Sequence, residues 1–141
     1  MKSFELLDHE ADVGIKAWGK TVEEAFAHGA QAMFSVMVNL EHITVEREID
    51  VEARAGDLEE LFVEWLNELL AQRDLSEMVF SKFEVEIKDE SGECVLTGKA
   101  KGEQLDHEKH EIRTEVKAAT YYGLRSGKES DLYYFQCVLD I

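Results

Sequence analysis

Two stretches of the chain repeat apolar residues at every third or fourth position, which is the spacing of an amphipathic helix. The first begins after Thr21, which has capping-box spacing with Glu24, and its apolar residues continue to Met37. The second follows Asp57, a favourable N-cap residue, and its apolar stripe continues to Leu70. The sequence therefore predicts two helices, each with a face suited to covering a sheet.

Around these helices apolar and polar residues alternate, which predicts half-buried strands. The expected strands cover residues 4–7, 13–18, 43–53, a hairpin within 83–100, 112–120 and 132–141. The last of them is apolar on both faces, as a central strand would be, so we expect the chain to end inside the fold. Together the elements predict an α+β fold: a mixed β-sheet covered by two amphipathic helices, in a single two-layer domain over residues 1–141.

The net charge of the chain indicates which classes of partner it can bind. It has 141 residues, with 15 Lys and Arg against 31 Asp and Glu, and a formal net charge of −16. This charge repels phosphate backbones, so we expect no direct binding of nucleic acid. The acidic surface either keeps the protein soluble or meets a basic partner.

Neither the N-terminal residues nor the cysteines indicate export. Charges interrupt the first apolar residues too early for a signal peptide, and no run of about 18 apolar residues occurs. We therefore expect a cytoplasmic protein with no membrane contact. Cys94 and Cys137 lie in separate strand-like segments without metal-ligand spacing, so buried free thiols are expected rather than a disulfide.

Ionisable side chains are concentrated in residues 8–12, just before a predicted strand, and Asp140 lies at the end of an apolar one. If Asp140 and the terminal carboxylate of Ile141 fold back beside Asp12, three carboxylates converge and repel one another unless a cation neutralises them. Such an all-oxygen set suits Ca²⁺, Mg²⁺ or Mn²⁺ better than Zn²⁺. The alternative is a solvated acidic loop with a frayed chain end.

A second polar cluster occupies residues 106–111, where His107 and His110 have a spacing that can hold a transition metal. Lys109 lies between them and no further ligand follows, so we interpret this segment as an exposed loop between strands. No glycine-rich phosphate loop or zincin pattern occurs anywhere in the chain, and this argues against an enzyme.

Several short motifs, taken in order, resemble the archease family. They are residues 8–14 (DHEADVG), 17–19 (AWG), 21–26 (TVEEAF), 65–70 (WLNELL), 114–121 (TEVKAATY) and 138–141 (VLDI). Their spacing covers nearly the whole chain. The sequence departs from the family at Glu10, where archeases often carry Thr, and at Tyr122, where many archaeal members carry His; such neighbours of a site can retune its choice of metal.

The resemblance implies an accessory protein of tRNA splicing, not an enzyme. Archeases activate an RtcB-type RNA ligase by promoting the metal-dependent transfer of GMP onto the ligase's histidine, and they permit multiple turnover. The family's divalent ion, seen as calcium, is held at positions that match Asp12, Asp140 and Ile141. The family lysine linked to activation matches Lys117, and His9 is a further candidate for activation or partner contact.

Two other functions compete with this interpretation. Archeases are also linked to tRNA methyltransferases, so a chaperone-like modulator of such an enzyme is one alternative, and it would need no metal. The enzyme alternative is a small metal-dependent phosphoesterase built from Asp8, His9, Asp12 and Asp140, in which His9 would shuttle a proton.

Overall fold

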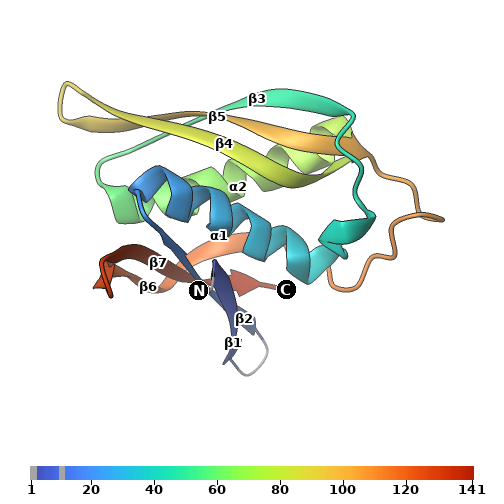
Figure 1. Cartoon of the computed structure of the whole chain (residues 1–141), viewed down its shortest axis with the longest axis horizontal. Coiled ribbons are helices and arrows are strands. Elements are labelled where there is room, and N and C mark those ends of the chain that lie inside the picture. The colour runs from blue at the N-terminus through green and yellow to red at the C-terminus, as the bar shows by residue number, and fades with distance from the viewer. Residues whose placement is uncertain (1–2, 10–11) are drawn as a thin grey trace.

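The computed structural model describes residues 3–9 and 12–141, with Asp8 and His9 described by their backbone alone. The elements are β1 (Phe4–His9), β2 (Asp12–Gly19), α1 (Val22–Met37), the short 3-10 helix η1 (Leu40–His42), β3 (Arg47–Ala55), α2 (Leu58–Ser76), β4 (Met78–Glu90), β5 (Glu93–Gln104), β6 (Ala118–Glu129) and β7 (Leu132–Asp140). One sheet has the strand order β1-β2-β7-β6, and a second has the order β3-β5-β4. Both helices lie between the two sheets (Figure 1).

The predicted α+β class, with two helices packed on sheet, is confirmed. The arrangement of the strands differs from the prediction, because they form two antiparallel sheets on opposite sides of the helices and not one mixed sheet in two layers. Helix α1 makes this possible because it is apolar around most of its circumference. The Phe26 ring packs on Phe135 of β7 at a centroid distance of 4.9 Å, and Phe34 packs on Phe80 of β4 at 5.5 Å.

Both helix starts agree with the sequence prediction. Thr21 Oγ1 accepts the Glu24 N–H at 3.0 Å, and Asp57 Oδ1 accepts the Glu60 N–H at 2.8 Å, so each cap satisfies one of the free amide groups of a first turn. The buried Trp65 of α2 donates from Nε1 to a carbonyl of α1 at 3.0 Å, which ties the two helices together. Within the described residues neither helix is long and apolar enough to span a membrane.

Two expected strands begin later than the alternation predicted. The strand expected from Ile43 begins at Arg47, and the strand expected from Ile112 begins at Ala118. The reason for the second difference is a missing partner: Ala118 pairs with Asp140, the last residue of β7, so the residues before Ala118 have no strand beside them. Residues 105–117 are instead a connecting segment without regular secondary structure.

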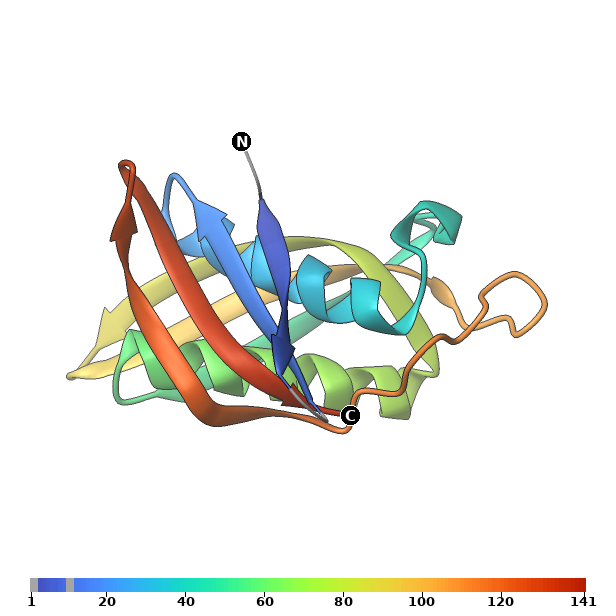
Figure 2. The same ribbon diagram turned by 90° about the horizontal axis from the view of Figure 1, so that it is seen from below.

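Main-chain hydrogen bonds fix this connecting segment to the ends of other elements. The N–H groups of Leu105, Arg113 and Lys117 each donate at 2.8 Å, to the carbonyl oxygens of Glu77, Met37 and Asp140 respectively. Figure 2 shows the segment crossing from β5, past the ends of α1 and α2, to the start of β6 near the C-terminus. Its path is therefore determined although it contains no strand.

Both cysteines are free thiols, as expected from their spacing. Cys137 is buried in β7, and burial raises the pKa of its thiol to about 12. Cys94 is only partly buried, so the prediction of a buried thiol holds for Cys137 alone.

Candidate functional site

The ends of two neighbouring strands bring the predicted acidic residues to one edge of a sheet. Strand β2 begins at Asp12 and the antiparallel β7 ends at Asp140. Val13 pairs with Leu139, so one further step of the same register places Asp12 opposite Asp140. In Figure 2 the C-terminus accordingly lies beside the start of β2.

The other two predicted site residues map to the same edge. His9 ends β1 and is the register partner of Asp12, although its side chain lies outside the described part of the structure. Lys117 directly precedes β6, and its N–H donates to the Asp140 carbonyl oxygen at 2.8 Å. Glu10, also part of the acidic motif, lies outside the described residues.

The described side chains at this edge leave their carboxylates available. Asp12 is partly buried and Asp140 is exposed, and neither carboxylate makes an ion pair or hydrogen bond with another described residue. The side chain of Ile141 is partly buried and packs against the hydrophobic core, so the end of the chain is held in place. The side chain of Lys117 is exposed.

This donor set fits a hard cation in its chemistry. Directly opposed residues of antiparallel strands have Cβ atoms about 5 Å apart, so one ion can reach both carboxylates. Oxygen donors alone favour Ca²⁺ or Mg²⁺. No group of three or more His, Cys, Asp or Glu side chains suited to a metal occurs among the described residues. The proposed third ligand is of another kind, because it is the main-chain carboxylate at Ile141.

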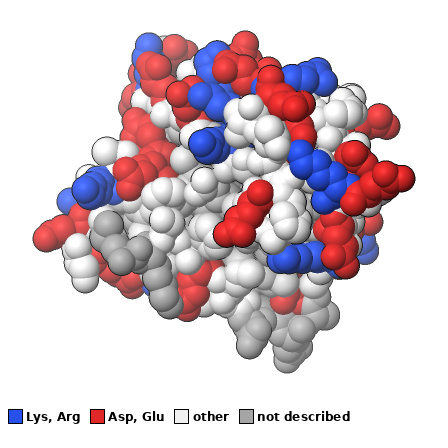
Figure 3. Space-filling view, turned by 45° about the vertical axis from the view of Figure 1, so that its right-hand side comes forward, with Lys and Arg blue, Asp and Glu red and all other residues white. Residues whose placement is uncertain are grey.

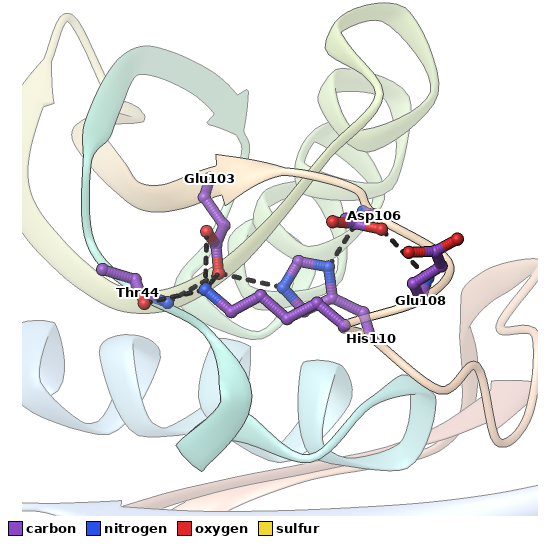
Figure 4. A network of polar contacts seen from close by, with 6 residues as sticks. Thr44, Glu103, Asp106, Glu108 and His110 are labelled. Carbon is purple, nitrogen blue, oxygen red and sulfur yellow. Dashed lines mark hydrogen bonds and ion pairs between the residues drawn. The ribbon is translucent and has the colours of Figure 1, made fainter.

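A second polar cluster, around Glu103 of β5, was not predicted as a unit. Its carboxylate accepts hydrogen bonds from the Thr44 N–H at 2.7 Å, from Lys109 Nζ at 2.9 Å and from His110 Nε2 at 2.9 Å (Figure 4). Burial by itself would raise the pKa of Glu103, but these three donors lower it to about 2.

The prediction of an exposed loop at residues 106–111 was wrong for His110. Its side chain has no exposed surface, and its Nδ1 accepts the Asp106 N–H at 3.0 Å. Both ring nitrogens are thus occupied by the protein, which leaves none for a metal shared with the exposed His107. The sequence signal that was missed is Glu103 seven residues earlier, a charged residue on an otherwise buried stretch of β5.

Comparison with known proteins identifies the family. Residues 4–141 match the family model described as Archease protein family (MTH1598/TM1083). The chain is 45% identical over 125 residues to protein archease of Pyrococcus furiosus, covering 89% of this chain and 88% of that protein. It is 40% identical over 141 residues to protein archease of Sulfolobus acidocaldarius, covering 100% of both chains. The solution structure of Methanobacterium thermoautotrophicum protein 1598 matches with a TM-score of 0.89 and 39% identity, again over 100% of both chains. The chain belongs to the archease family.

Proposed function

We propose that this protein is a metal-binding accessory factor that activates an RtcB-type tRNA-splicing ligase by promoting the ligase's guanylylation and its multiple turnover. Membership of the archease family supports an accessory role related to tRNA splicing in general. The observation that supports the finer proposal is the facing position of Asp12 and Asp140 at the ends of β2 and β7. Two carboxylates so placed, without a cationic partner among the described residues, favour binding of a divalent ion.

Each residue at this edge has a distinct part in the proposal. Asp12, Asp140 and the carboxylate of Ile141 hold the ion, for which we propose Ca²⁺, with Mg²⁺ and Mn²⁺ as the alternatives. When bound, the ion would neutralise the negative charges of the facing carboxylates. Two neighbouring residues contact the ligase: Lys117, whose N–H is bonded to Asp140, and His9, the register partner of Asp12.

The proposed division of labour leaves catalysis to the ligase. The ligase holds GTP and RNA, and the accessory factor acts on its guanylylation step. A formal net charge of −16 supports this division, because it disfavours contact between this protein and an RNA backbone.

Single-turnover guanylylation of a purified cognate ligase, with GTP and divalent metal, tests the proposal. We expect the wild-type protein to accelerate the reaction, and we expect Asp12→Ala, Asp140→Ala or deletion of Ile141 to eliminate the acceleration. Asp50→Ala is the matched control, because Asp50 is an exposed aspartate on the outer face of the other sheet. Wild-type acceleration by any ligand variant would contradict the assigned ligands.

A C-terminal extension gives an independent test of the terminal carboxylate. A few residues added after Ile141 convert its carboxylate to an amide and should abolish the acceleration. Another outcome would support the metal-independent chaperone role. In that case neither the wild-type protein nor any variant accelerates guanylylation of the ligase, and Asp12→Ala still keeps a tRNA methyltransferase soluble.

A further inference from the structure

A groove of about 510 Å³ lies between the C-terminal ends of α1 and α2 and the connecting segment. Its floor is apolar and is made by residues that end α1 or begin β4, namely Met37, Val38, Met78 and Val79. Ile112 of the connecting segment lines one wall and is 43% exposed. On α2, Leu75 follows the lining residue Asp74 and is 79% exposed. Apolar side chains are therefore left accessible both inside and next to the groove.

The charged residues of the groove give it an acidic rim. The one arginine that lines it, Arg73, pairs with Asp74 at 2.9 Å and donates to the Val116 carbonyl oxygen at 3.0 Å, so its positive charge is already engaged. The carboxylates of Glu77 and Glu115 make no ion pair with another described residue. A partner at this surface thus meets negative charge around an apolar floor.

The connecting segment links the groove to the candidate metal site. Glu115 precedes Lys117 by two residues, and the Lys117 N–H is bonded to the carbonyl oxygen of Asp140. Figure 3 shows an uncharged area on this side of the molecule, with an acidic side chain within it and both acidic and basic side chains along its border. A protein that covers the strand edge is therefore in reach of the groove as well.

We propose that this groove receives a segment of the ligase in which an apolar side chain is flanked by Lys or Arg. The inference rests on the proposed function, which supplies the ligase as the partner. The apolar side chain packs against Ile112, which lines the groove and is 43% exposed. The basic flanks meet Glu77 and Glu115, and this complementarity raises the association rate and selects the orientation of docking.

The dissociation constant of the complex between this protein and the purified cognate ligase tests the groove directly. We expect the double variant Glu77→Lys/Glu115→Lys to weaken binding about tenfold or more at low salt, because reversed charges at an interface repel the partner. The variant Ile112→Asp should weaken binding to a similar degree, because it places a charge against an apolar contact. The control is Glu86→Lys, an exposed carboxylate towards the far end of β4, which should change the constant less than about twofold.

Calcium titration of the same variants by calorimetry separates the groove from the metal site. Groove variants should bind calcium as the wild type does, and their unchanged circular dichroism melts should show that they are folded. Wild-type affinity of both groove variants for a ligase that the protein still activates would overturn the groove and leave the proposed function standing. Failure of the wild-type protein to bind or activate the ligase would overturn the proposed function, and the groove assignment with it.

Discussion

His110 donates from Nε2 to the buried carboxylate of Glu103 at 2.9 Å while its Nδ1 accepts the N–H of Asp106 at 3.0 Å. A nitrogen that accepts carries no proton, so this arrangement selects the tautomer with the proton on Nε2. The same carboxylate accepts from Lys109 Nζ and from the Thr44 N–H. One side chain of β5 thus fastens both the start of the connecting segment and the residues that lead into β3.

Removal of this carboxylate should destabilise the protein. We expect Glu103→Ala to lower the free energy of unfolding by on the order of 2 kcal/mol, because His110 and Thr44 lose a charged acceptor. Urea denaturation followed by circular dichroism measures the change. Glu108→Ala is the control in the same loop, because the Glu108 side chain is exposed and the bond from Glu108 to Asp106 is made by its main-chain N–H. Equal stability of the two variants would show that the cluster contributes nothing.

The same cluster predicts how stability changes with pH. The pKa of Glu103 is about 2 in the folded protein, below the ordinary value of 4.5, so the unfolded chain takes up the proton first as the pH falls. Its contribution is complete above about pH 4.5 and is lost as the pH falls towards 2. We expect the difference in unfolding free energy between wild type and Glu103→Gln to shrink across this interval. A difference that stays constant between about pH 6 and about pH 2, an interval that brackets the ordinary carboxyl pKa, would contradict the assignment.

The helices and hairpins were predictable because their signals are local. Thr21 and Asp57 mark the helix starts within one turn, and alternation marks β4 and β5. Residues 112–117 show why alternation is not sufficient: a strand also needs a neighbour, and β7 ends before it can supply one. The division of the strands into two sheets depends in the same way on pairings between distant segments.

The strand ends of the candidate site could be located from the sequence, but their meeting could not. Asp12 and Asp140 face each other through the pairing of β2 with β7, and only the resemblance to the archease family had matched both residues to one ion. His110 was not predictable in this way, because its burial depends on a carboxylate from β5 and on the tertiary path of the connecting segment. The polar sequence of residues 106–111 does not indicate which distant carboxylate will bond to His110.

Close contact between the helices predicts the effect of a single methyl group. A Cβ added at Gly29 of α1 would lie 2.4 Å from Cε1 of Phe62 on α2, well inside van der Waals contact. We expect Gly29→Ala to destabilise the protein by about 1–2 kcal/mol, because overpacking outweighs the gain of about 1 kcal/mol in helix propensity. Chemical denaturation of Gly29→Ala, Phe62→Leu and the double variant measures their coupling. Strictly additive changes would mean that the two sites do not touch.

The exposed Tyr121 provides a spectroscopic test of the packing between β6 and α2. Its hydroxyl donates to a carboxylate oxygen of Glu64, and this bond raises the pKa of the phenol to about 12. We expect Glu64→Gln to return that pKa towards its ordinary value of 10. Ultraviolet difference titration, with Tyr121→Phe to identify the signal, follows the shift. An unchanged high-pH phase in Glu64→Gln would exclude the negative charge of this acceptor as the cause of the raised pKa.

Metal binding at the strand edge should reverse the relative stabilities of the wild type and Asp12→Asn. In chelator, Asp12→Asn should melt at the same temperature as the wild type or higher, because it removes one of two like charges that face each other across the strands. In calcium at about 100 times the dissociation constant, the wild type should gain about 2.7 kcal/mol, and the variant should gain much less. Asp50→Asn should respond to calcium as the wild type does, since Asp50 lies on the other sheet. Equal stabilisation of Asp12→Asn and wild type by calcium would remove Asp12 from the ligand set, because a carboxylate that holds the ion cannot be replaced by an amide without loss of affinity.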